Sequence, residues 1–120
     1  MTGPFDDLIA AAALKYDVPG SLIAAVIAHE SRGEPEAVGD NGVARGLMQM
    51  HPSACTTVGA NWEDMFDPEK AIDAGTAYLK WNYDHFSDWT WALAAYNRGI
   101  TVILAGKTYA DKVLALQAAT

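Results

Sequence analysis

The stretch GSLIAAVIAHESRG, residues 20–33, is an apolar run that ends in a histidine, a glutamate, a serine and an arginine before a glycine. Its apolar side chains recur at helical spacing, which predicts a buried helix. Ile23, Ile27 and Glu30 lie on one stripe of that helix, so the Glu30 carboxyl points toward its apolar side. An ionised carboxylate in such a place is costly unless it is compensated. The end of this helix is therefore where we look first for chemistry.

Capping residues, prolines and glycines divide the rest of the chain into further helices and one irregular segment. Ser21 is the expected N-cap of the central helix and Gly33 its C-terminal stop. Residues 34–46, EPEAVGDNGVARG, contain a proline, Asp-Asn-Gly and three glycines, which predicts a loop or hairpin. A first helix is expected to start within residues 2–4 and to end near 16, and a short one to cover 53–58. A long helix is expected after the N-cap Asp67 up to 86, and another from the cap at 87 or 88 to the stop at 99. Two last helices are expected over 101–105 and 109–118. The prediction is a single compact all-α domain of 120 residues with one long irregular loop, 34–46, next to the candidate site.

The composition argues against several classes of partner. A formal net charge of -7 argues against binding to nucleic acid and to anionic membrane surfaces, both of which attract basic patches. No apolar run is long enough for a membrane span, and the first sixteen residues lack the basic start of a signal peptide. Cys55 is the single cysteine, so no internal disulfide forms. We expect neither nucleic acid nor membrane as a partner.

Burial of Glu30 would raise its pKa toward neutrality and make it an acid able to donate a proton near pH 7. Cleavage of a glycosidic bond needs such an acid, because the leaving sugar oxygen must be protonated. The alternative is a helix-end glutamate that is simply solvated, or one that is paired with nearby Arg32. A zinc protease pattern fails, because its second histidine would stand where Gly33 is. A thiol site built on Cys55 and His51 is a weaker hypothesis, since a lone cysteine is more often a small buried group.

Three longer segments and one short pattern occur in a fixed order along the chain. They are VPGSLIAAVIAHESRGEPEAVGDNGVARGLMQMHPSA at 18–54, DPEKAIDAGTAYLKW at 67–81, WALAAYNRG at 91–99, and Tyr109 with a valine four residues on. This ordered set resembles the soluble lytic transglycosylase and goose-type lysozyme group of the lysozyme superfamily. The resemblance covers nearly the whole chain and implies a lysozyme-like, peptidoglycan-cleaving domain.

The resemblance also implies roles for individual residues. Glu30 is the catalytic acid, in a Glu-Ser pair with Ser31. Tyr96 and Asn97 match a segment in which the tyrosine hydroxyl lies close to the catalytic carboxyl. The segment that lines the glycan cleft corresponds to Gly46, Leu47, Met48 and Gln49, and the amide of Gln49 binds an N-acetyl sugar. No metal or organic cofactor is implied.

Other side chains are assigned to packing or to sugar contacts. Gly75 is expected to mark a close packing contact of its helix. Met48 and Met50 are more often core filler than ligand contacts. The aromatic residues expected in the core are Trp81, Trp89, Trp91 and Tyr96. The two that could stack on a saccharide are Trp62 and Tyr109.

The fate of the sugar end depends on a second carboxylate. Inverting hydrolysis needs one about 6.5 to 9.5 Å from the acid to activate a water. Resemblance to goose-type lysozymes makes Asp40 this candidate base, whereas Asp-Asn-Gly is also an ordinary turn. The second aspartate of the goose-type pattern is replaced by His51, and GVARGLMQMHP is closer to the transglycosylase version. A lytic transglycosylase needs no such base, because the muramic acid 6-hydroxyl attacks internally and leaves a 1,6-anhydro end. Both outcomes stay open.

The expected function is cleavage of the β-1,4 bond between N-acetylmuramic acid and N-acetylglucosamine in bacterial peptidoglycan. Chitin oligomers are a second expected substrate, and a monomer acting on the cell wall is expected. The absence of a signal peptide fits a phage lysin or an excised domain of an exported protein. The alternative function is a non-catalytic glycan-binding or structural module of a phage tail or secretion machine.

Overall fold

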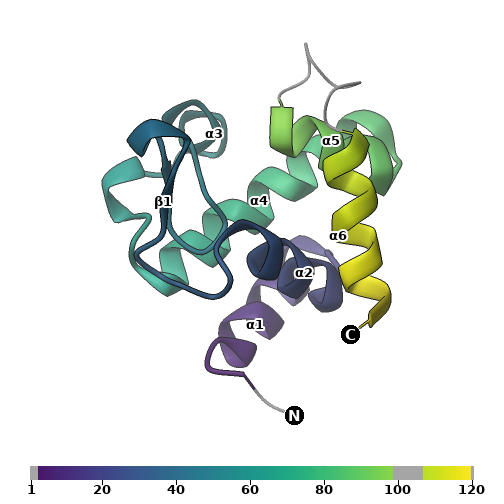
Figure 1. Ribbon diagram of the computed structural model, residues 1–120, viewed down its shortest axis with the longest axis horizontal. Coiled ribbons are helices and arrows are strands. Elements are labelled where there is room, and N and C mark those ends of the chain that lie inside the picture. The colour runs from purple at the N-terminus through teal and green to yellow at the C-terminus, as the bar shows by residue number, and fades with distance from the viewer. Residues whose placement is uncertain (1–2, 99–106, 120) are drawn as a thin grey trace.

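The computed structural model describes residues 3–98 and 107–119, and it confirms the predicted all-α domain (Figure 1). The helices are α1 (Asp6–Tyr16), α2 (Gly20–Glu30), α3 (Pro52–Val58), α4 (Pro68–Phe86), α5 (Trp89–Arg98) and α6 (Lys107–Ala119), with short 3₁₀ turns η1 (Asp40–Gly42) and η2 (Trp62–Asp64). The long helix α4 runs through the middle and packs against α1, α3 and α5, while α6 packs against α2 and α5. None of the helices in these two ranges is long and apolar enough to cross a membrane.

The predicted boundary of α4 is confirmed, and that of α2 is not. Asp67 accepts a hydrogen bond from the backbone N–H of Lys70 at 3.0 Å, so it caps α4 as expected. At α2 the N-cap is Pro19, because the helix already includes Ser21. The helix ends at Glu30, three residues before Gly33. The predicted stop at Gly99 and the helix over 101–105 lie outside the described residues.

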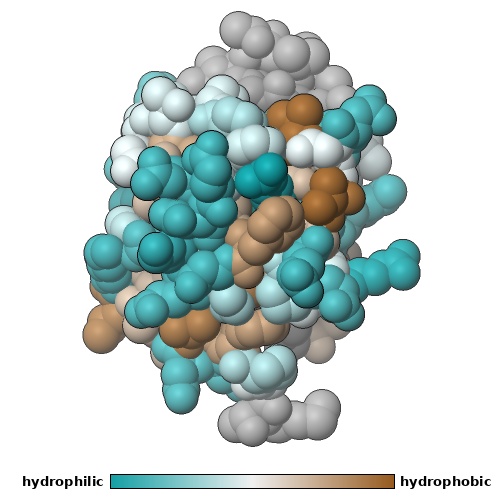
Figure 2. Space-filling model, turned by 90° about the vertical axis from the view of Figure 1, so that its left-hand side faces the viewer, coloured by the Kyte–Doolittle hydropathy of each residue, from teal (hydrophilic) through white to brown (hydrophobic). Residues whose placement is uncertain are grey.

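The irregular loop contains the predicted hairpin. Strands β1 (Val38–Gly39) and β2 (Ala44–Arg45) pair antiparallel, with η1 as the connection between them. Arg45 is also bridged to Met50, with N–H···O distances of 3.1 and 3.0 Å. Figure 2 shows the face on this side of the molecule, where hydrophilic side chains cover most of the surface and hydrophobic ones lie between them. The hairpin thus has an exposed turn and a second strand that is held against the body, since Ala44 is buried and Arg45 is bridged to Met50.

One core contact decides where the segment after the hairpin lies. A Cβ on Gly75 would lie 2.4 Å from Sδ of Met48, so α4 and residue 48 touch at a place where only glycine fits. The close contact predicted at Gly75 is therefore confirmed, although its partner is a loop residue. Met48 and Met50 are fully buried, as expected of core filler.

The aromatic residues divide between core and surface. Tyr96 is buried as predicted, but Trp81 is exposed, and Trp89 and Trp91 are half-buried. Ile72, Gly75, Leu79 and Asn82 form the buried stripe of α4. Trp81 lies off that stripe, where its ring stacks on Tyr78 and lies tilted against His85, so its assignment to the core is wrong.

Candidate active site

Glu30 is the last residue of α2, and its carboxyl is half-buried. The pKa of Glu30 is raised from 4.5 to about 7. Burial is the main cause; the Tyr109 hydroxyl lowers this pKa and the negative charge of Asp40 raises it. The predicted rise toward neutrality is confirmed. Among the described side chains no ion pair joins Glu30 to Arg32, so the paired alternative does not hold. The simply solvated alternative does not hold either, because the residue is half-buried. Near pH 7 this carboxyl can both give and take a proton.

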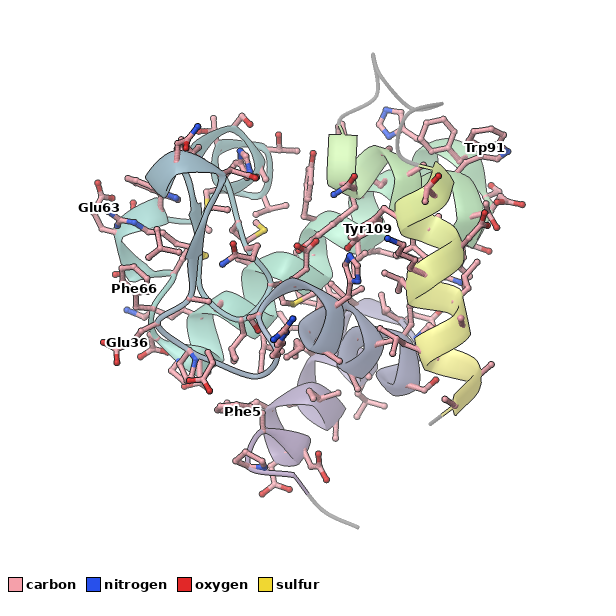
Figure 3. The ribbon with its side chains drawn as sticks, viewed as in Figure 1. Phe5, Glu36, Glu63, Phe66, Trp91 and Tyr109 are labelled. Atoms are coloured by element: carbon pink, nitrogen blue, oxygen red, sulfur yellow. The ribbon has the colours of Figure 1, made fainter. Side chains whose placement is uncertain are left out.

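Tyr109 reaches this carboxyl from α6 and points toward α2 (Figure 3). Its ring is 7% exposed and packs edge-on against His29, with ring centroids 5.0 Å apart. The suggestion that Tyr109 stacks on a sugar is therefore wrong, because its ring is covered. Its buried hydroxyl makes no hydrogen bond of good geometry to any described residue, yet it faces the Glu30 carboxyl and lowers the pKa of that carboxyl as a hydrogen-bonding neighbour. A buried hydroxyl beside an acid tunes the proton affinity of that acid.

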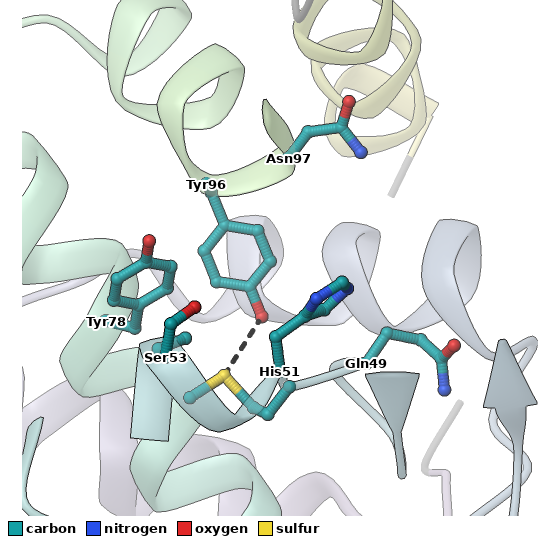
Figure 4. Close-up of a pocket in the computed structure, with 8 residues that line it drawn as sticks. Gln49, His51, Ser53, Tyr78, Tyr96 and Asn97 are labelled. Atoms are coloured by element: carbon teal, nitrogen blue, oxygen red, sulfur yellow. Dashed lines mark hydrogen bonds between the residues drawn. The ribbon is translucent and has the colours of Figure 1, made fainter. Parts of the chain in front are cut away.

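Tyr96 lies on α5, and its side chain is buried. Its hydroxyl donates a hydrogen bond of 2.6 Å to the carbonyl oxygen of Met48 and lies 3.8 Å from Sδ of Met50 (Figure 4). The charge of Glu30 helps to raise the pKa of Tyr96, so the two groups are electrostatic neighbours. Since its hydrogen goes to Met48, Tyr96 holds the segment after the hairpin in place against α5.

The Gly-Leu-Met-Gln segment supplies less of the cleft lining than the resemblance implies. Leu47 and Met48 are fully buried, so their side chains pack in the core and do not face a ligand. Gly46 is buried with a left-handed φ of 82°, and a Cβ there would lie 1.9 Å from the Met65 carbonyl oxygen. The contribution of these three residues is to place Gln49.

Gln49 is the part of this segment that remains accessible. Its Nε2 donates to the carbonyl oxygens of Ala37 at 3.1 Å and Gly46 at 3.0 Å, which ties the two ends of the hairpin together. Its Oε1 lies over Gly39, where a Cβ would be only 2.5 Å away. Both amide hydrogens are committed to the protein, so only the amide oxygen is left to accept from a sugar.

Ser31 has a structural role that the resemblance did not suggest. The residue is buried, and its Oγ donates to the carbonyl of Ile27 at 3.1 Å and accepts from the N–H of Gly33 at 3.2 Å. These bonds close the end of α2, after which Arg32 takes a left-handed φ of 54°. Its hydroxyl thus ends the helix beside Glu30, and the assignment of Ser31 to substrate binding stays a prediction.

A pocket of about 180 Å³ opens beside Tyr96 (Figure 4). Its lining residues are Gln49, Met50, His51, Ser53, Ala54, Tyr78, Tyr96 and Asn97. Three of the predicted site residues, Gln49, Tyr96 and Asn97, come together in this lining. Glu30 is not part of it. Tyr78 and Ser53 were missed by the sequence reasoning. Helical spacing on α3 and α4 could have indicated them only once the packing of those helices was known.

The side chains of Asp40 and His51 are joined by a hydrogen bond beside the pocket that His51 lines. The distance between Asp40 Oδ2 and His51 Nε2 is 2.8 Å, and both side chains are substantially exposed. Asp40 has a left-handed φ of 49° and Asn41 one of 58°, so the turn character of Asp-Asn-Gly is real. The side chain of Asp40, however, reaches His51 and not its own backbone.

Burial and contacts decide the roles of Cys55 and Trp62. Cys55 is buried, and burial raises the pKa of its thiol, so it is the small core residue expected and not a nucleophile. Trp62 donates from Nε1 to two backbone carbonyls, and the Arg45 guanidinium lies 3.5 Å from its ring centroid. One face of Trp62 is thus occupied by the protein. Among the described residues, no cluster of histidine, cysteine, aspartate or glutamate side chains could hold a metal ion.

Comparison with known proteins gives this geometry a family. Residues 7–114 match the family model described as the transglycosylase SLT domain. The chain belongs to that family. A transglycosylase of Enterobacteria phage PRD1 is 34% identical over 111 residues, which are 90% of this chain and 41% of that protein. The membrane-bound lytic murein transglycosylase F of Pasteurella multocida is 36% identical over 98 residues, which are 75% of this chain and 19% of the relative.

Solved structures agree with the SLT assignment. The 70-kDa soluble lytic transglycosylase of Escherichia coli superposes with a TM-score of 0.80 at 25% identity, over 95% of this chain and 23% of that one. The SLT domain described here therefore spans well under half the length of each of these three proteins. The lysozyme-like fold predicted from the sequence is confirmed.

Proposed function

We propose that this SLT domain cleaves the β-1,4 bond between N-acetylmuramic acid and N-acetylglucosamine in bacterial peptidoglycan and leaves a 1,6-anhydro end. The observation that carries the proposal is the half-buried Glu30 carboxyl with a pKa of about 7. The lytic murein transglycosylases among its relatives support the substrate and the product. A hydrolytic reaction, in which Asp40 orients water, is the alternative outcome.

The reaction divides into two proton transfers through one carboxyl. Protonated Glu30 gives its proton to the glycosidic oxygen as the bond from that oxygen to the muramic acid C1 breaks. The carboxylate left behind then accepts the proton of the muramic acid 6-hydroxyl, whose oxygen forms the new bond to C1. Glu30 returns to its protonated state, and no water is consumed. A pKa near neutrality suits a group that serves as acid and then as base.

The pocket beside Tyr96 offers the polar groups that a glycan substituent needs. The amide oxygen of Gln49 accepts from an acetamido N–H, and the Asn97 amide offers a donor and an acceptor. The volume of this pocket, about 180 Å³, fits one sugar substituent and not a whole saccharide. We assign it to an N-acetyl group of a sugar next to the cleaved bond.

Mass spectrometry of muropeptides released from purified peptidoglycan tests the proposal. We expect 1,6-anhydromuramic ends from the wild type, and release from chitin oligomers is measured alongside. Mainly reducing ends would establish hydrolysis instead and would point to Asp40. Binding to peptidoglycan without any release would establish the binding-module alternative.

The rate should report the protonation state of Glu30. Because the first step needs the proton, we expect kcat/KM to be constant below pH 7 and to fall about tenfold per pH unit above it. Tyr109→Phe removes a group that lowers the Glu30 pKa, so the falling limb should move to higher pH. Asp40→Asn removes a charge that raises it, so the limb should move to lower pH. Asp84→Asn, an exposed charge on α4, is the control that should leave the limb in place.

A further inference from the structure

The Asp40–His51 pair is built into the hairpin and is not a chance surface contact. Asp40 directly follows β1, and its backbone is left-handed with a φ of 49°. His51 directly follows Met50, which is bridged to Arg45 of β2. The two partners of the 2.8 Å contact are thus anchored at neighbouring points of one small sheet.

Each partner of the pair is connected to one part of the site. The negative charge of Asp40 is close enough to act on Glu30, and the His51 ring lines the pocket beside Tyr96. A carboxylate only accepts hydrogen bonds, so His51 must donate through Nε2, as a cation or as the neutral ring with its hydrogen there. Oδ2 of Asp40, whose carboxylate acts on Glu30, therefore already accepts a hydrogen bond from His51.

A carboxylate that orients an attacking water must accept a hydrogen from that water and later its proton. A carboxylate that already accepts a charge-assisted hydrogen bond is a poorer proton acceptor and is held in one orientation. His51 stands at the position where the goose-type pattern has a second aspartate. In this chain that position thus carries His51, a hydrogen-bond donor that binds Asp40.

We infer that His51 is a positioning residue that sets the fate of the sugar end: by holding Asp40, it keeps this carboxylate from delivering water, so that attack by the 6-hydroxyl prevails. This inference rests on the proposed role of Glu30 in cleaving peptidoglycan. Water added at C1 would give a reducing end, with one hydrogen on the new hydroxyl and the other proton passed to Asp40 and then to solvent. Attack by the 6-hydroxyl gives the anhydro end with no net water.

The test compares the ratio of reducing to anhydro ends at pH 5, about two units below the pKa of Glu30 in the wild type. His51→Leu removes the donor, and we expect it to raise this ratio several-fold. His51→Gln keeps an N–H donor and should raise it less. The double variant His51→Leu with Asp40→Asn should return the ratio to that of the wild type, because the released carboxylate is gone. Partial unfolding of a variant would lower both products together, so the ratio reports only the folded molecules.

A measurement without substrate checks the pair itself. The ¹⁵N chemical shifts of the His51 ring should change in Asp40→Asn, and they should not change in Asp84→Asn. Unchanged shifts in Asp40→Asn would overturn the inference, since the pair would not exist in solution. An unaltered product ratio in His51→Leu, or a raised ratio that persists in the double variant, would also overturn it. Failure of the proposed function has a different signature, which is no release of either end by the wild type.

Discussion

Replacing Glu30 by glutamine is expected to lower muropeptide release by on the order of 10³-fold at pH 6, because the amide has no proton to give to the leaving oxygen. Glutamine has nearly the same shape, so the hydroxyl of Tyr109 and the surrounding core keep their places. The measurement is the rate of release of soluble muropeptides by wild type and variant under equal conditions. Binding of both proteins to insoluble peptidoglycan should remain equal.

The stability of this variant provides the control against unfolding. The pKa of Glu30 is about 7 in the folded state and 4.5 ordinarily, so between these pH values the folded protein holds a proton that the unfolded chain has lost. The wild type therefore loses stability as the pH rises through this window, by up to about 3 kcal/mol in total. Glu30→Gln has no such loss, so at pH 8 it should be the more stable protein in urea unfolding.

Two results would contradict the role of Glu30. Release above one tenth of the wild-type rate would mean that another group protonates the leaving oxygen. A variant that is less stable than the wild type at pH 8 would mean that the carboxyl is ionised and paired in the folded state. The second result would also remove the basis for the expected pH dependence.

The helices and the acid could be predicted because their signals are local. Asp67 followed by proline marks the start of α4, and the apolar stripe of α2 carries Glu30 into a desolvated place. The end of α2 was predicted less accurately than the start of α4. Gly33 is the stronger stop signal in the sequence, but Ser31 closes the helix earlier with its own hydroxyl.

The side-chain directions in the Gly-Leu-Met-Gln segment could not be predicted from residue types. Gln49 has a left-handed φ of 51°, and Tyr96 and Gly75 hold residue 48 from two sides, so the segment presents its backbone and one amide to the pocket. These constraints come from α4 and α5, which lie far along the chain. The pairing of Asp40 with His51 is equally non-local, although the unusual histidine was visible as a departure from the pattern.

Gly46→Ala is expected to be the most destabilising single substitution in the site. The backbone of Gly46 has a φ of 82°, which disfavours any side chain by roughly 1–2 kcal/mol. A Cβ would in addition lie 1.9 Å from the carbonyl oxygen of Met65, so backbone must move, at a further cost of about 1–3 kcal/mol or more. A loss of this size should lower the midpoint of thermal unfolding by roughly 10–20 °C in a domain of this length.

Gly33→Ala separates the two contributions. Gly33 has a similar φ of 79°, but nothing lies within 4 Å of the position of a Cβ there. It should therefore show only the backbone penalty and unfold at a temperature between those of the wild type and Gly46→Ala. Equal losses in the two variants would mean that the loop yields to the new methyl group. The contact between residues 46 and 65 would then not be what fixes Gln49 at the pocket, and the hydrogen bonds of its own amide would have to do so alone.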